Sequence, residues 1–283
     1  MDTLEHRIQH RIQLGQCEAE RLTEYLHTLP ADAWRHPSAC AAWEVRDVVG
    51  HLTLFAELYA GAVSRGVHGD VSPLEGFPPI GALAGASVAP FIAQSAIARR
   101  ASLGEQLLPT FTARQEQLHH VLAGLTSQDW DTPCYHFVGP FPVRAFYTLR
   151  VTELALHGWD IRSALEPGAS LFPESLPVLM DLATLRVGGN FRPGVRLAVP
   201  IRYRFVITGV VPGTPDLVVE GDQAHWEPRG SAEAHVTYHC DTETFVLLMY
   251  SRLTQETATA KGRLVSEGDG QWAVAFDQWF KGS

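Results

Sequence analysis

The chain has 283 residues, of which 46% are apolar and 19% charged, so it contains enough apolar material for two packed domains of ordinary size. Its net charge is -9, and its longest run of basic residues is the pair Arg99 and Arg100. This argues against a nucleic-acid binder, because proteins that bind phosphates usually present a basic face. No stretch approaches about 18 consecutive apolar residues, so we expect no membrane-spanning segment.

The four cysteines, at positions 17, 40, 134 and 240, are far apart in the sequence and form no C-x-x-C pair. We therefore expect reduced thiols in a cytoplasmic protein. Residues 1–16 are rich in charge and lack an apolar stretch, so they do not resemble a secretory signal. The expected assembly is a monomer or a homodimer, and nothing in the sequence decides between the two.

Two helices with apolar faces are expected first. Apolar residues at helical spacing predict a helix over residues 3–29, which Pro30 ends. After a loop over 32–42, a second helix begins near Trp43, with acidic residues in its first turn. His51 lies about two turns into this helix, on its apolar face. Taken alone, His51 is either an ordinary buried histidine or a metal ligand.

The next segments are a long loop and two further helices. Residues 64–90 are rich in Gly and Pro, and we expect them to form a cap over one end of a helix bundle. A third helical stretch is predicted over 90–124, with a kink at Pro109. The connection 129–142 then leads into a fourth helix that ends near Glu166.

The fourth helix carries a polar stripe. Arg150, Glu153, His157 and Asp160 are three or four residues apart and share one side of a helix that is otherwise mostly apolar. Buried ionisable groups must be paired, hydrogen-bonded or bound to a metal, so Glu153 and His157 form either a structural hydrogen bond or two ligands of a divalent ion. Gly158 predicts the close approach of another backbone, since glycine costs about 1 kcal/mol inside a helix.

A second domain is expected after about residue 170, where period-two alternation appears. The predicted strands cover 195–211, 216–220, 234–239 and 262–266, and the predicted helices cover 176–190, 241–252 and 270–280. The fold class is therefore α+β: a four-helix bundle over residues 1–168, followed by a small antiparallel sheet with helices over 169–283.

Two segments of the first domain carry a family resemblance. Residues 43–51 resemble the W-x-V-R-D-V-x-x-H segment, and residues 150–161 resemble the R-x-x-E-x-x-x-H-x-W-D segment, of the DinB-like metalloenzymes called mycothiol-dependent maleylpyruvate isomerases. The last third of the chain resembles the sterol-carrier-like domain usually joined to that bundle. This weaker likeness rests on Asp241, Thr244, Phe245, Arg252, Gly262 and residues 267–269.

The resemblance implies a site and a chemistry. His51, Glu153 and His157 would hold a divalent metal, usually zinc, with an open position for a thiol. The thiol would come from mycothiol, a small cosubstrate of actinobacteria, and the metal would favour its thiolate. Addition to an activated double bond would then give cis-trans isomerisation, and addition to another electrophile would give S-transfer. Asp160 would orient a ligand imidazole or a substrate group, and Arg150 would pair with Asp160 or Glu153.

Two other functions fit the same residues. One is a metal-dependent hydrolase or lyase in which Asp160 or another base takes a proton from water. The other is a non-catalytic carrier that encloses a small molecule, with the metal structural or absent. The substrate is not identified by the sequence. A dicarboxylate substrate would require cationic partners, and the candidates are Arg99, Arg100, Arg252 and Arg263.

Overall fold

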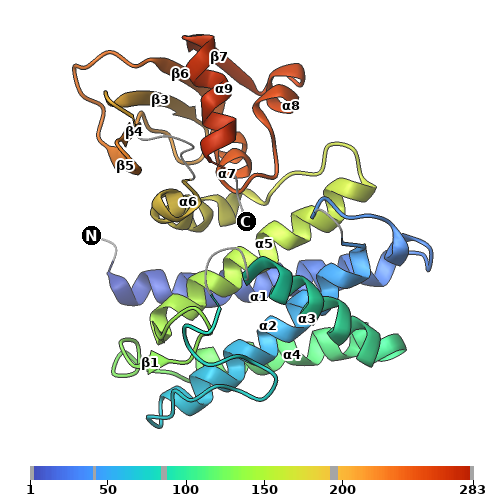
Figure 1. The fold of residues 1–283 in the computed structure, drawn as a ribbon. Coiled ribbons are helices and arrows are strands. Elements are labelled where there is room, and N and C mark those ends of the chain that lie inside the picture. The colour runs from blue at the N-terminus through green and yellow to red at the C-terminus, as the bar shows by residue number, and fades with distance from the viewer. Residues whose placement is uncertain (1–2, 41–42, 84–87, 192–196, 281–283) are drawn as a thin grey trace. The chain divides into compact units, whose positions relative to one another are not determined.

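The computed structural model describes residues 3–40, 43–83, 88–191 and 197–280. The chain divides into two compact units, Met1–Ser170 and Leu171–Ser283. Helices make up most of the first unit and the second combines helices with a sheet, which confirms the α+β class (Figure 1). None of the described helices combines the length and apolar character needed to cross a bilayer.

The first unit contains the predicted helix bundle. Its long helices are α1 (Leu4–Thr28), α2 (Val45–Gly66), α3 (Val88–Leu103), α4 (Leu107–Ala123) and α5 (Val143–Leu165). Four of them pack in a ring, in the order α1, α4, α2, α5 and back to α1, while α3 adds to α2 and α4 (Figure 1). The predicted four-helix bundle therefore contains one further helix, α3.

The third predicted helix is in fact two helices. A 3-10 turn over Gly104–Gln106 separates α3 from α4, and Gly104 adopts a left-handed conformation with φ 52°. The kink expected at Pro109 is wrong. Pro109 lies in the first turn of α4, where a helix has no use for the amide hydrogen that proline lacks.

The glycine- and proline-rich loop is attached to a small hairpin. Strands β1 (Pro133–Cys134) and β2 (Phe141–Pro142) pair antiparallel just before α5. The Tyr135 hydroxyl donates to the Pro78 carbonyl at 2.5 Å, and the Gly81 amide donates to the Phe137 carbonyl at 3.2 Å. Residues 67–83 contain no helix or strand, and positions 84–87 of the predicted cap lie outside the described residues.

The second unit is built on a five-stranded sheet with strand order β5-β4-β3-β6-β7. Its strands are β3 (Ile201–Thr208), β4 (Asp216–Glu220), β5 (Gln223–Glu227), β6 (Val236–Asp241) and β7 (Leu264–Gly268), and its helices are α6 (Leu176–Asn190), α7 (Thr242–Met249), α8 (Gln255–Ala260) and α9 (Gly270–Trp279). The sheet is antiparallel as predicted, except that β3 and β6 pair in parallel. The sequence pattern missed β5 and α8, and positions 195–196 of the long predicted strand lie outside the described residues.

Aromatic and basic residues alternate along β3, so one face of the strand packs into an aromatic core and the other carries charges. Tyr203 and Phe205 are fully buried, and their rings pack against Phe276 of α9. On the other face of β3, Arg202 and Arg204 both pair with the buried Asp216 of β4. Burial opposes the charge of Asp216, but the two arginines outweigh it and lower its pKa. The sheet is therefore held by apolar packing on one face and by paired charges on the other.

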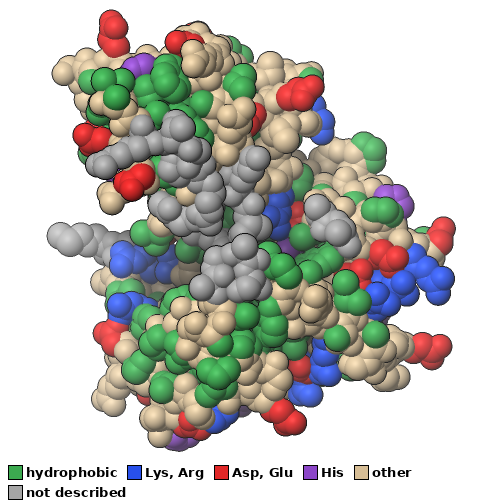
Figure 2. Space-filling view, viewed as in Figure 1, with side chains coloured by type: hydrophobic (Ala, Val, Ile, Leu, Met, Phe, Trp, Pro, Cys, Tyr) green, Lys and Arg blue, Asp and Glu red, His purple; other side chains and the backbone are tan. Residues whose placement is uncertain are grey.

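Acidic and basic side chains are mixed over the surface. On the face drawn in Figure 2, no continuous basic patch crosses the described residues, and Lys or Arg side chains lie beside Asp or Glu. Glu57 of α2 is a half-buried example: it pairs with Arg99 of α3 and with Arg114 of α4, the latter at 2.8 Å. Many of the cations thus have carboxylate partners within the fold.

Candidate metal centre

Three side chains from α2 and α5 converge on one point. The Nε2 atom of His51 lies 2.8 Å from Glu153 Oε2, and the Nε2 atom of His157 lies 3.3 Å from the same oxygen. One ligand atom from each residue lies within 4.8 Å of the other two. Glu153 and His157 are one turn apart on α5, and the packing of α2 against α5 brings in His51.

The three side chains are partly enclosed by aromatic rings. His51 is 4% exposed and His157 8%, while the Glu153 side chain keeps 23% of its surface. Trp43 lies against both imidazoles, with ring centroids 5.1 Å from His51 and 6.1 Å from His157. Phe55, one turn after His51, is 4.4 Å from it. The two imidazoles are thus shielded, and Glu153 is the most exposed of the three residues.

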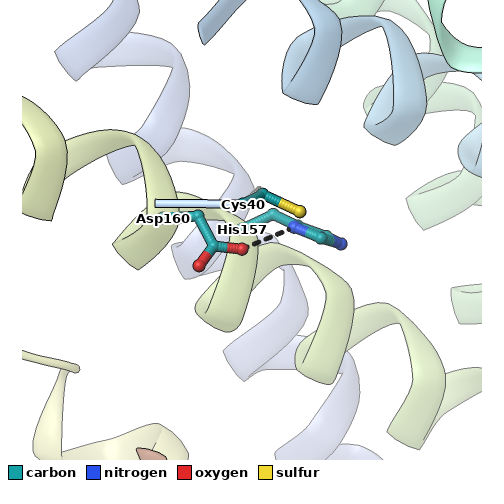
Figure 3. A group of neighbouring side chains, drawn as sticks. All are labelled: Cys40, His157 and Asp160. Carbon is teal, nitrogen blue, oxygen red and sulfur yellow. Dashed lines mark hydrogen bonds and ion pairs between the residues drawn. The ribbon is translucent and has the colours of Figure 1, made fainter. Parts of the chain in front are cut away.

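Asp160 fixes the orientation of one imidazole. Its carboxylate is fully buried and lies 2.9 Å from His157 Nδ1, which donates to it (Figure 3). The Nε2 atom of that ring is therefore the one that faces Glu153 and His51. This arrangement of carboxylate and imidazole is typical of metal-ligating histidines, because it fixes the tautomer and increases the basicity of the ligand nitrogen.

A second group of possible ligands shares His157. The sulfur of Cys40, from the loop before α2, lies within 4.8 Å of atoms of His157 and Asp160 (Figure 3). In this group, however, Nδ1 of His157 already donates its proton to Asp160. In the neutral ring only Nε2 has a lone pair for a cation, and it faces Glu153. The donor geometry therefore favours the group of His51, Glu153 and His157.

The protonation states of His157 and Glu153 depend on each other. Burial disfavours the charged form of His157, but its hydrogen bonds with Asp160 and Glu153 outweigh burial and raise its pKa to about 9. Burial likewise opposes ionisation of Glu153, but the two histidines hold its pKa well below the usual range. The centre thus stabilises a carboxylate beside positive charge. A cation and a proton compete for the same nitrogen lone pairs, so acid will weaken metal binding.

The loop before α2 is held against α5. The Ala39 amide donates to the Asp160 carbonyl at 3.0 Å, and the Ser38 amide donates to the Trp43 carbonyl at 2.8 Å. A capping box formed by Glu44 and Asp47 then starts α2. These bonds fix where α2 begins relative to α5, and so place His51 opposite Glu153.

One family profile covers most of the first unit. The profile of the mycothiol maleylpyruvate isomerase N-terminal domain matches residues 16–162, more than half of the chain. The chain belongs to this family. The match includes all three residues of the candidate centre and Asp160. No curated protein matches the sequence.

Solved structures of the family's namesake share the fold. A crystal structure of the mycothiol-dependent maleylpyruvate isomerase has a TM-score of 0.61, and that of a single-residue mutant has 0.62. Each is 11% identical to this chain, and each match covers 92% of both chains. A sterol carrier protein 2 like 2 from Aedes aegypti covers 36% of this chain at 18% identity with a TM-score of only 0.27.

Arg150, the fourth polar residue of the stripe, has other partners than expected. Its guanidinium donates to the Gln115 carbonyl at 3.2 Å and lies 3.4 Å from His119 Nδ1, so its hydrogen bonds go to α4 and not to Glu153 or Asp160. Burial lowers the pKa of Arg150 to about 10, against the charge of Glu20. Arg150 thus joins α5 to α4 through its hydrogen bonds. Its predicted catalytic role stays a prediction.

The arginines considered as substrate partners also have partners of their own. Arg100 donates to Asp47 at 2.8 Å, and Arg99 pairs with Glu57. In the second unit, Arg252 donates to the Tyr250 carbonyl at 3.1 Å and Arg263 to the Thr244 hydroxyl at 2.9 Å. Their contacts therefore do not favour any of these four as a dedicated carboxylate receptor.

Two residues near the centre were not predicted. Cys40 lies in an irregular loop, and His136 lies in the β1–β2 connection, where burial lowers its pKa to about 4 while the charge of Glu153 raises it. Neither residue belongs to a periodic element. No spacing rule could therefore relate them to the centre, and only the folded loops bring them close to it.

Proposed function

We propose that the family domain holds a divalent metal at His51, Glu153 and His157 and uses it to activate a low-molecular-weight thiol, mycothiol, for addition to an electrophilic small molecule. The observation that carries this proposal is the convergence of two imidazole nitrogens and one carboxylate oxygen within 4.8 Å, with Asp160 orienting His157. Two histidines and one glutamate form a donor set of the kind that catalytic zinc sites use.

The protein's own groups have distinct parts in this chemistry. A bound divalent ion would supply positive charge that favours the thiolate form of an incoming thiol. Asp160 keeps Nδ1 of His157 protonated and Nε2 available, while Trp43 and Phe55 limit the access of water to the imidazoles. Glu153 is the most exposed of the three ligands, so the thiol would approach from its side. We infer zinc as the ion, because it accepts this mixture of nitrogen and oxygen ligands.

The reaction class follows from the thiolate. Its sulfur adds to one carbon of a polarised double bond and leaves a single bond that can rotate. Elimination of the same thiolate then returns the trans alkene and the free thiol, so the thiol is not consumed. If the electrophile carries a leaving group instead, the product is a thiol conjugate. The family's description names a maleylpyruvate isomerase. Isomerisation of maleylpyruvate-like compounds is therefore the first reaction to test.

The structure argues against Asp160 as the base of a hydrolase. Its carboxylate has no exposed surface and is bonded to His157, so it is not placed to receive a proton from a water molecule at the centre. No contact among the described residues favours the carrier function. Both alternatives remain as outcomes of the experiment below.

The experiment combines metal analysis with a thiol titration. We expect about one divalent ion per chain in the native protein and a change in the visible spectrum of the cobalt-substituted form on adding mycothiol. Glu153→Gln should lose the metal and the spectral response. Glu57→Gln is the matched control, since Glu57 is a half-buried carboxylate on α2 whose partners are Arg99 and Arg114.

Three results would contradict the proposal. A full complement of metal in Glu153→Gln would remove Glu153 from the centre. A cobalt spectrum indifferent to mycothiol would favour water as the reacting group and hence a hydrolase or lyase. Retention of small-molecule binding by a metal-free His51→Ala variant, without thiol-dependent turnover in the native protein, would favour the carrier.

A further inference from the structure

An open hollow of about 400 Å³ lies between α2, α3 and the loop that follows α2. Leu54 and Leu58 of α2 and Leu74 and Phe77 of the loop give it apolar walls. All the residues that line it belong to the first unit. Hollows of roughly 300 to 1,000 Å³, with mostly apolar walls and a few polar groups, are typical of small-molecule sites.

The hollow is separate from the candidate metal centre. None of the described residues that line it is a ligand of the centre, or one of the rings, Trp43 and Phe55, that pack on its imidazoles. Glu57, which lines the hollow, follows His51 by six residues, so the two side chains differ by about 240° in direction around α2. His51 accordingly faces α5, whereas Glu57 faces α3 and α4. A molecule bound in the hollow therefore need not touch the metal.

A tight turn forms the loop side of the hollow. The Phe77 amide donates to the Leu74 carbonyl at 3.0 Å, and Gly76, the third residue of this turn, has φ 81°. A left-handed third position requires glycine in most such turns. Leu74 packs over the bare backbone of Gly61 on α2, where an added Cβ would collide with Leu74 Cδ2. The turn is thus seated on α2, and the wall it forms exists before any ligand arrives.

Three of the four charged side chains around the hollow already have ionic partners. Arg65 donates to Asp70 at 2.7 Å, and Arg99 pairs with Glu57. Glu75, in the middle of the turn, is exposed. Over residues 3–40, 43–83, 88–191 and 197–280, we find no hydrogen bond or ion pair of its carboxylate. Glu75 is therefore the group that decides which charge the hollow prefers in a ligand.

We propose that this hollow is a second ligand site, which binds a small apolar amine. The apolar body of the amine lies against the four apolar walls, and its ammonium group lies beside the Glu75 carboxylate. Burial of apolar surface supplies most of the affinity, and Glu75 supplies the preference for positive charge. An anion gains little from Arg65 and Arg99, because Asp70 and Glu57 already neutralise them, and Glu75 repels it.

The test compares three probes with the same apolar body: 4-phenylbutylamine, 4-phenylbutan-1-ol and 4-phenylbutanoate. In titration calorimetry of the zinc-loaded full chain, the amine should bind about fivefold more tightly than the alcohol, and the carboxylate most weakly. Salt at about 1 M should abolish the preference for the amine, because it screens an exposed ion pair. Glu75→Gln should bind the amine and the alcohol equally. Glu116→Gln is the matched control, since Glu116 is an exposed carboxylate of α4 that does not line the hollow, and it should keep the preference.

Two further measurements locate the bound amine. An amine is itself a metal ligand, so the titration is repeated after chelation, and the affinity should be unchanged. In amide spectra of the nitrogen-15-labelled protein, adding the amine should shift the signals of residues 54–58 and 74–77 and leave those of residues 153–160 in place. Leu74→Ala removes one apolar wall without changing any charge, so it should weaken the binding of all three probes by the same factor.

Four results would overturn the proposal. Failure of all three probes to bind, or equal affinity of the native protein for the amine and the alcohol, would remove the site or its charge preference. An undiminished preference for the amine in Glu75→Gln would show that another group recognises the ammonium. Loss of amine binding on chelation, with shifts confined to residues 153–160, would place the amine on the metal. These outcomes do not depend on mycothiol, so they leave the test of the proposed function unaffected.

Discussion

At the scale of residues, the candidate site is defined by which nitrogen of each histidine carries a proton. Asp160 accepts a hydrogen bond from Nδ1 of His157, which keeps the proton on that nitrogen and directs Nε2 towards Glu153. The Val138 amide has the opposite effect on His136, where the proton lies on Nε2. The neutral form of one ring therefore has its lone pair on Nε2, and that of the other has its N–H group there. Two residues of the same type thus acquire complementary chemistry from their hydrogen-bond partners.

The acid sensitivity of folding should report the environment of His136. Its folded pKa is about 4, against about 6.5 in an unfolded chain. Between these values the unfolded state binds a proton that the folded state does not, so this group makes the free energy of unfolding fall as the pH drops from 6.5 towards 4. The loss amounts to about 2 to 3 kcal/mol. In His136→Phe, urea unfolding at pH 7 and pH 4.5 should show a smaller difference by about that amount. An unchanged difference would mean that His136 is not buried as a neutral ring.

The residue scale also shows which part of the site was predictable. Glu153, His157 and Asp160 lie in contact, as their spacing on a single helix predicts. Arg150 was placed with them on the same grounds, but it lies against α4, since residues three apart on a helix still differ by about 60° in direction. His136 could not be found from sequence, because a short irregular hairpin has no period from which its position follows.

At the scale of elements, close packing of α2 places His51. Gly50, directly before it, is where α3 approaches: an added Cβ would lie 2.7 Å from the Ala96 carbonyl oxygen and 3.0 Å from Arg100 Cβ. The sequence suggested such an approach at Gly158 instead, and that expectation is wrong. The nearest atom to a Cβ there is a side-chain carbon, Leu22 Cδ1, at 3.9 Å. A glycine within a helix pattern therefore does not by itself show which helix pair is in close contact.

The two glycines should respond to alanine in opposite directions. Gly50→Ala forces α3 away from α2 and should lower the free energy of unfolding by about 1 to 3 kcal/mol, as overpacking usually does. It should also reduce metal occupancy, since His51 moves with α2. Gly158→Ala meets only ordinary van der Waals contact and improves helix propensity, so it should raise the stability by up to about 1 kcal/mol. Denaturant unfolding and metal analysis of both variants check this. A destabilised Gly158→Ala protein with an unaffected Gly50→Ala protein would contradict the packing described here.

At the scale of the whole molecule, the chain builds two cores of different kinds. The first is a helix bundle with two apolar clusters, and the second is an aromatic layer under a sheet. Helix periodicity and strand alternation were enough to predict the α+β class. They did not predict the parallel pairing of β3 and β6, because strand order depends on contacts between segments far apart in the sequence.

Because each unit has its own core, metal binding should stabilise the two units unequally. An ion that joins α2 to α5 adds its binding free energy to the folded state of the first unit, by about 2.7 kcal/mol at a free concentration a hundred times its dissociation constant. Hydrogen exchange of the full chain, with zinc and after chelation, tests this. Chelation should speed exchange of protected amides in Val45–Gly66 and Val143–Leu165 by up to about a hundredfold, and leave those of Ile201–Thr208 and Val236–Asp241 nearly unchanged. Glu153→Gln should resemble the chelated protein from the start and show no response to zinc. Equal acceleration in both units would mean that they unfold as one, and no acceleration in α2 and α5 would mean that the ion binds elsewhere.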